Sequence, residues 1–294
     1  MEIFEKPVED PVNRSPDPAL SPGAQRIGDP LWTTPLLTAL SLLIAIAVSF
    51  IGSGAFGGTP VQQVAGGYLS ADATLLAPAG PAFSIWSVVY TGLAVYGIYQ
   101  LTAPGRRSGW GAKLRVPAMI SALLNAAWIS VVQLGWLGFS VIVIFALVAV
   151  LAWMIRLMSS GTPGSRTEYW VIWLTFGLYL GWVCVASIAN VAAWLLSLGV
   201  GEGARWAPAT AVALVVVAAL MAMAISYYAG NAFAALAISW GLAWIGVSRL
   251  AGSNPSEIVG YASLGCALAA LLGSLLIAWR RRTAAGAGAG GRIS

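Results

Sequence analysis

Residues 171–194 sort polar and aromatic side chains onto one side of an uncharged stretch. Tyr179, Trp182, Ala186 and Asn190 recur at spacings of three and four, so they form one stripe on an α-helix. A phenol, an indole and a carboxamide on one face can stack on a flat molecule and offer it hydrogen bonds. A helix that contacts only lipid has no need to sort these groups. The stripe therefore faces other helices or a ligand.

Two further segments carry similar stripes. Phe83, Trp86 and Tyr90 repeat at spacings of three and four, and Asn125 precedes Trp128 by three positions. A carboxamide in hydrocarbon must find hydrogen-bond partners, so Asn125 is expected to point into a helix bundle. Two interpretations stay open at this point. Either these side chains only hold helices together, or they line an aromatic pocket whose polar groups orient a flat apolar ligand.

The composition indicates which elements position these side chains. Of the 294 residues, 59% are hydrophobic and only 9% are charged, which is outside the range of soluble domains. The apolar runs reach the length of about 20 residues that a helix needs to cross a bilayer. The alternating segments of a β-barrel are not seen. The sequence predicts an all-α polytopic membrane helical bundle of about eight helices, over Leu31–Ile51, Phe83–Ala103, Val116–Leu134, Leu137–Met158, Tyr169–Leu196, Ala207–Tyr227, Asn231–Val247 and Ile258–Trp279.

The basic residues predict how these helices are oriented. All of the 15 Lys and Arg residues except Arg205 and Arg249 belong to the two tails and the connections after the second and fourth predicted helices. Lys and Arg near helix ends stay on the cytoplasmic side. We therefore expect a multi-pass protein of the bacterial cell membrane with both termini in the cytoplasm. The net charge of +5 indicates contact with anionic membrane lipid and no nucleic-acid partner.

Missing residue types narrow the chemistry. The chain has no histidine, which excludes an imidazole base and histidine-ligated metals. The central parts of the predicted spans carry no charged residue, which argues against an ion-coupled pump. We predict no catalytic residue, no metal site and no cofactor. A binding or transport protein is favoured over an enzyme.

Three segments carry a family resemblance. They are Pro78–Tyr90 with its Phe, Trp and Tyr, Leu124–Trp128 with its Leu-Asn-Ala-Ala-Trp, and Tyr179–Asn190 with its Tyr-Leu-Gly-Trp-Val start. They lie in order on the second, third and fifth predicted helices. Together they resemble the signatures of the tryptophan-rich sensory protein/translocator protein (TspO/MBR) family, in a long and divergent branch.

The resemblance implies a division of the chain. Residues 31–198 would form a TspO-like core of five membrane helices, and residues 199–280 would add three transmembrane helices. Residues 1–30 and 281–294 are rich in small, charged or proline residues and are expected to be flexible tails. The last three helices would either pack around the core or pair with a second copy in a homodimer.

The resemblance also implies a function. The core would hold a porphyrin, a sterol or an isoprenoid-like planar apolar molecule, with a sensory, regulatory or transport role. The longest connection, residues 52–82, would form a lid over the cavity. The ligand-binding residues would be Phe83, Trp86, Tyr90, Asn125, Trp128, Tyr179, Trp182, Ala186 and Asn190.

Other functions stay open on the sequence alone. The protein could be a membrane carrier for a small neutral metabolite, in which the last three predicted helices complete an aqueous pathway. In a separate alternative, Asn231, Trp240 and Trp244 of the seventh predicted helix line the ligand cavity. The protein could also be a scaffold subunit whose aromatic stripes only hold helices together.

Overall fold

The computed structural model describes residues 32–52, 60–61, 63–201 and 203–290. These residues form helices and connections, and none of them is in a β-strand. The predicted tail at residues 1–30 lies outside the described residues, as do positions 53–59 of the predicted lid.

Eight long helices account for most of the described chain. Seven of them are long and apolar enough to cross a membrane, and Thr33–Ser49 forms a shorter apolar helix. The prediction of an all-α polytopic membrane bundle is therefore confirmed. The helices are α1 (Thr33–Gly52), α2 (Ile85–Leu101), α4 (Gly109–Gln133), α5 (Leu137–Ser159), α6 (Arg166–Ser197), α7 (Ala207–Ala229), α8 (Phe233–Ala251) and α9 (Glu257–Gly290).

Short elements and caps shift some boundaries from those expected. The 3-10 turns η2 (Ala65–Gly67) and η3 (Gly80–Ser84) lie in the connection before α2, and the one-turn helix α3 (Ala103–Arg107) follows α2. Helix α4 begins seven positions earlier than predicted, because the Ser108 hydroxyl accepts a hydrogen bond from the backbone N–H of Gly111. Such a cap satisfies a backbone donor that the first turn leaves free.

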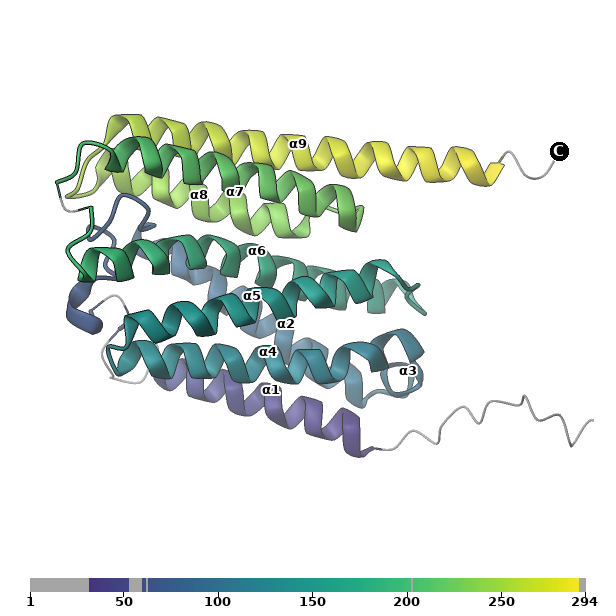
Figure 1. The fold of residues 1–294 in the computed structure, drawn as a ribbon. Coiled ribbons are helices and arrows are strands. Elements are labelled where there is room, and N and C mark those ends of the chain that lie inside the picture. Colours follow the sequence, from purple (N-terminus) through teal and green to yellow (C-terminus); the bar gives the residue numbers. More distant parts are fainter. Residues whose placement is uncertain (1–31, 53–59, 62, 202, 291–294) are drawn as a thin grey trace, which may run out of the picture.

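The helices form two groups that lie side by side (Figure 1). Helices α1, α2, α4, α5 and α6 build the first group, and α7, α8 and α9 build a second layer that contacts it through α6 and α8. Two glycines of α6 make this contact close. A Cβ atom at Gly181 would lie 2.1 Å from the carbonyl oxygen of Ala234, and one at Gly177 would lie 2.6 Å from Cβ of Phe233. Small residues allow this backbone approach in membranes.

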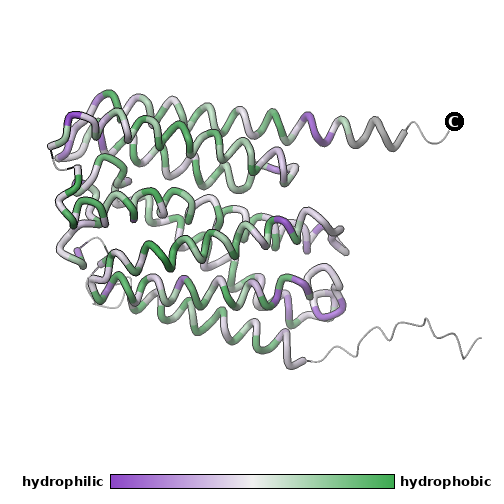
Figure 2. Tube along the Cα trace, in the orientation of Figure 1, coloured by the Kyte–Doolittle hydropathy of each residue, from purple (hydrophilic) through white to green (hydrophobic). Residues whose placement is uncertain are grey.

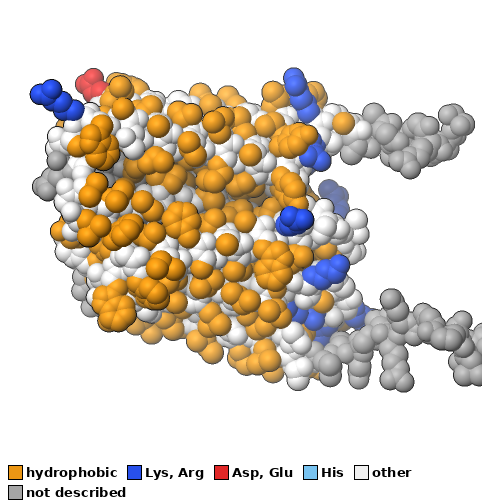
Figure 3. All heavy atoms as spheres, viewed as in Figure 1, with side chains coloured by type: hydrophobic (Ala, Val, Ile, Leu, Met, Phe, Trp, Pro, Cys, Tyr) orange, Lys and Arg blue, Asp and Glu red, His pale blue; other side chains and the backbone are white. Residues whose placement is uncertain are grey.

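The two ends of the bundle differ in charge. On the face drawn in Figure 3, hydrophobic side chains cover the middle of the bundle, and most Lys and Arg side chains gather at the end where α9 leaves it. Figure 2 shows the same pattern along the chain trace, with hydrophilic positions toward the helix ends. The start of α1 lies at this end too, and the connection before α2 lies at the opposite end (Figure 1).

Helix α9 continues past the boundary expected at residue 281. It ends at Gly290, since the alanine-rich segment after Arg282 contains no proline to stop it. Arg281 also donates a hydrogen bond to the backbone oxygen of Tyr227 at the end of α7.

Candidate functional site

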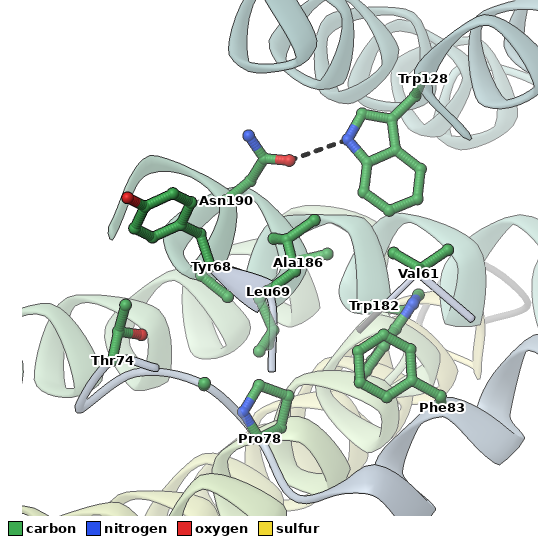
Figure 4. Close-up of a pocket in the computed structure, with 13 residues that line it drawn as sticks. Val61, Tyr68, Leu69, Thr74, Pro78, Phe83, Trp128, Trp182, Ala186 and Asn190 are labelled. Carbon is green, nitrogen blue, oxygen red and sulfur yellow. Dashed lines mark hydrogen bonds between the residues drawn. The ribbon is translucent and has the colours of Figure 1, made fainter. Parts of the chain in front are cut away.

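A small cavity lies at the end of the bundle opposite the start of α1 and the C-terminal end of α9 (Figure 1). Its roof is the connection before α2, residues 60–61 and 63–82, which we call the lid. Its walls come from η3, α4 and α6. The lining residues are Val61, Tyr68, Leu69, Thr74, Ala77, Pro78, Phe83, Trp128, Trp182, Val185, Ala186, Ala189 and Asn190 (Figure 4).

The cavity is partly enclosed and its lining is almost entirely apolar. Its volume is about 40 Å³, which is room for roughly three water molecules. Ligand pockets in proteins are typically about 300–1,000 Å³. The lid therefore covers a space much smaller than a polycyclic ligand.

Trp182 of α6 is the central aromatic residue of the wall. Its side chain is 1% exposed, and the rings of Phe83 and Trp86 meet it edge-on at centroid distances of 5.7 and 6.3 Å. Its indole N–H is buried without a hydrogen-bond partner, and so is the hydroxyl of Thr74 in the lid. A buried unpaired polar group costs about 1–3 kcal/mol. Both residues line the cavity, where a ligand or water could satisfy them.

Trp128 of α4 is held in the wall by a polar network. Its indole nitrogen donates to the side-chain oxygen of Asn190 at 2.9 Å (Figure 4). The side-chain nitrogen of Asn190 donates to the hydroxyl of Ser140 on α5, also at 2.9 Å. Since Asn190 is 1% exposed, its carboxamide fixes three helices and the Trp128 ring.

The structure brings five of the predicted site residues together around the cavity. Three of them are the aromatic residues already described on η3, α4 and α6. The α6 stripe contributes the other two with its carboxamide and its alanine. The five are Phe83, Trp128, Trp182, Ala186 and Asn190.

The other four predicted residues do not line the cavity; they pack beside it. Trp86 stacks on Tyr90 at 5.2 Å and meets Tyr179 edge-on at 6.0 Å. The side-chain nitrogen of Asn125 donates to the hydroxyls of Ser49 and Tyr90. The hydroxyl of Tyr179 donates to the backbone oxygen of Ser121. These residues join α1, α2, α4 and α6.

Several lining residues were missed by the sequence patterns. Val185 follows Trp182 by three positions, and Ala189 follows Ala186 by three. The helical spacing on α6 could therefore have identified both. The lid residues Leu69 and Thr74 have no periodic signal, because their positions depend on how the connection folds over the bundle.

The aromatic residues of α8 contact the lid and not the cavity. The indole nitrogen of Trp240 donates to the backbone oxygen of Ala82 at 2.9 Å. The backbone oxygen of Trp244 accepts from the N–H of Ala79 at 3.1 Å. Asn231 is used locally, where its side-chain oxygen accepts from the backbone N–H of Phe233. These three residues are not among those that line the cavity, so the alternative in which they line it does not agree with this arrangement.

Among the described lid residues, the charged side chain is that of Asp72, which is exposed at the outer surface. The Ser70 hydroxyl donates to the Asp72 carboxylate at 2.6 Å and is the main cause that holds the pKa of Asp72 below its usual value. Among the described residues that line the cavity, none is an acid, a lysine or an arginine. The site is therefore suited to binding and stacking, and it offers no paired acid and base.

Comparisons with known proteins agree with the motifs. A family model described as TSPO-like protein matches residues 35–276. The match includes α7, α8 and most of α9 as well as the first five long helices. A search of the curated proteins and a search of the solved structures each find no match.

Proposed function

The chain belongs to the TSPO-like protein family, and on this premise we propose that it binds a planar apolar molecule in the cavity beneath the lid. The observation that carries the proposal is the apolar aromatic wall with a buried, unpaired indole N–H at Trp182. Porphyrins, sterols and isoprenoid-like molecules have the shape and apolarity that suit such a wall. The role would be sensory, regulatory or in transport.

The residues divide into two layers in this proposal. Phe83, Trp128 and Trp182 would contact the ligand face or edge, and Ala186 would leave space for it. Asn190 would act by fixing Trp128. The second layer would keep the first in position, and it consists of Trp86, Tyr90, Asn125 and Tyr179.

The unpaired groups suggest a polar feature of the ligand. The indole N–H of Trp182 only donates, so it calls for an acceptor such as a carbonyl, carboxylate or ether oxygen. Thr74 can donate or accept. We therefore expect a flat apolar ligand with an oxygen at one edge.

The small volume of the cavity implies that binding moves the lid. A cavity of about 40 Å³ cannot hold a tetrapyrrole or a sterol without displacement of residues around it. The lid is the wall that belongs to no long helix, so it is the part that moves at least cost.

We propose that both termini are cytoplasmic and that the lid lies on the outer side of the cell membrane. Most of the described basic side chains lie at the end of the bundle away from the lid, as the positive-inside rule requires. Pairing of two copies stays a prediction, which cross-linking of the protein in membranes would test.

Fluorescence tests the ligand proposal. Purified protein in detergent is titrated with protoporphyrin IX, a sterol and a carotenoid precursor, and tryptophan quenching is followed. We expect saturable quenching by at least one of them in the parent protein and weaker quenching in Trp182→Leu. Flux of the same compound into proteoliposomes separates transport from sensing.

A scaffold is the second candidate. It is favoured by the second layer, in which the Asn125 side-chain nitrogen donates to Tyr90 and the Tyr179 hydroxyl donates to the backbone. In that case no planar compound quenches saturably, and the aromatic stripes only hold the helices together.

A further inference from the structure

Helix α8 and the residues just after it hold the middle of the lid through three side chains. The hydroxyl of Ser248 donates to the backbone oxygen of Ala71 at 2.9 Å, and the guanidinium of Arg249 donates to the same oxygen. The side-chain nitrogen of Asn254, just after α8, donates to the backbone oxygen of Asp72 at 2.9 Å. Residues 71 and 72 are thus fixed to a helix far away in the sequence.

Arg249 is the centre of this contact. Its side chain is 0% exposed, although it ends in a cation. The guanidinium also donates to the backbone oxygen of Asn254 at 2.6 Å and to the hydroxyl of Ser248 at 2.7 Å. Hydrogen bonds from a charged donor are among the strongest in proteins. Of this buried cation, Nη2 donates to the lid backbone, Nη1 donates outside the lid, and Nε has no partner. The Nη2 bond makes Arg249 a strong fixing point.

Helix α8 holds the far end of the same stretch as well. The indole nitrogen of Trp240 donates to the oxygen of Ala82, and the oxygen of Trp244 accepts from the N–H of Ala79. Thr74, which lines the cavity, lies between the two fixing points. We call Trp240, Ser248, Arg249 and Asn254 the clasp.

The same helix also supports the cavity wall. A Cβ atom at Gly241 of α8 would lie 2.7 Å from the side chain of Val185, and Val185 lines the cavity. One helix outside the first five therefore contacts both the lid and the wall that it covers.

We propose that Arg249 is a positioning residue of the ligand site, and that the clasp controls lid opening and hence the rates at which ligand enters and leaves. The inference rests on the proposed function for its ligand, but the opening itself needs no ligand. The cavity of about 40 Å³ is too small for a planar ligand, so entry requires displacement of the lid, and the clasp bonds hold the lid against this movement. The second layer of helices is in this way part of the site.

Thiol labelling measures lid opening without any ligand. Ala77 lines the cavity from the lid and is 5% exposed. Ala77→Cys is placed in a protein whose own cysteines are removed by Cys184→Ala and Cys266→Ala, and membranes are treated with an impermeant maleimide. We expect slow labelling, and labelling about tenfold faster after Arg249→Gln, since a charge-assisted hydrogen bond is lost.

Graded variants separate the clasp from general damage. Trp240→Phe removes one lid bond, and Ser248→Ala removes one lid bond and one acceptor of the guanidinium. Both variants keep the buried cation, so both should fold and label a few-fold faster. Arg249→Lys should fall between arginine and glutamine. Arg205→Gln removes an exposed arginine from the connection between α6 and α7, which lies at the same end of the bundle (Figure 1), and should label at the parent rate. Size-exclusion elution and helical circular dichroism identify variants that do not fold.

Ligand release supplies the second readout. Protoporphyrin IX is bound to the parent protein and to Ser248→Ala, and recovery of tryptophan fluorescence is followed after dilution. We expect faster release from the variant by a factor similar to the labelling change. Equal labelling rates in the parent, Ser248→Ala and folded Arg249→Gln would overturn the clasp. Faster labelling in a protein that no planar compound quenches would retain the clasp and reject the ligand class.

Discussion

The indole nitrogen of Trp128 and the side-chain oxygen of Asn190 are 2.9 Å apart, in a hydrogen bond that joins α4 to α6. The two residues belong to different sequence motifs and meet at the wall of the cavity. The side-chain nitrogen of Asn190 donates a hydrogen bond to the hydroxyl of Ser140 on α5. The carboxamide is thus a junction of three helices, and the orientation of the Trp128 ring depends on it.

This junction should be measurable as a coupling energy. Trp128→Phe removes the donor and Asn190→Ala removes the acceptor. In a double-mutant cycle we expect a coupling of about 0.6 kcal/mol, and at most about 1.7 kcal/mol, as for other hydrogen bonds between membrane helices. Reversible unfolding in mixed detergent measures it. A coupling of zero would mean that the two side chains do not meet in the membrane.

Trp182 should contribute to binding by stacking and by its N–H. Trp182→Leu should weaken binding of a quenching planar ligand by roughly 2- to 12-fold, as expected for about 0.5–1.5 kcal/mol of aromatic contact. Trp182→Phe keeps a ring and should weaken only ligands with an edge oxygen. Trp279 is 61% exposed at the other end, so Trp279→Leu is the control. Equal loss in all variants would instead indicate general destabilisation.

The contact between the two helix layers should depend on Gly181. A methyl group there would lie 2.1 Å from the backbone oxygen of Ala234. A backbone atom cannot relieve this clash by a change of rotamer. Gly181→Ala should therefore lower the thermal midpoint and separate α8 from α6. At Gly265 of α9 nothing lies within 4 Å of an added Cβ, so Gly265→Ala should be neutral or stabilising by up to about 1 kcal/mol. A stable Gly181→Ala protein would contradict this packing.

The acid Asp72 should titrate below its usual range. The hydrogen bond from Ser70 lowers its pKa, so the carboxylate contributes stability above about pH 4, the unfolded value. This contribution is lost as the pH falls through the lowered folded pKa. The lid should therefore be insensitive to pH between 5 and 8. Carboxyl-carbon NMR shifts, assigned with Asp72→Asn, measure the pKa, and Ser70→Ala should raise it.

Reporter fusions should show both ends of the chain on one side. Reporters after Ser294 and within residues 104–115 should read cytoplasmic, and one inserted at Ser70 should read external, because the basic residues gather away from the lid. A cytoplasmic signal at Ser70 would overturn both the helix count and the outward position of the lid.

Local patterns were enough for the fold class and part of the site. Length and apolarity predict membrane helices, since each span must be apolar along its own length. The three-and-four spacing of Trp182, Ala186 and Asn190 predicted one shared face, and all three line the cavity. Trp86 and Tyr90 shared a face with Phe83 as well, yet they pack on each other beside the cavity. Spacing identifies a face but not the neighbour that it meets.

By itself, the sequence determined the spanning segments and the stripes, because these follow from composition and helical periodicity within one segment, and its three motifs resembled the family. Only the tertiary structure decided which stripe residues reach the cavity and what closes it. Arg249 shows the reason. In the sequence it is a basic residue near a helix end, whereas in the fold it is buried against the backbone oxygen of Ala71. A hydrogen bond between residues so far apart in the chain exists only once α8 has packed against the lid.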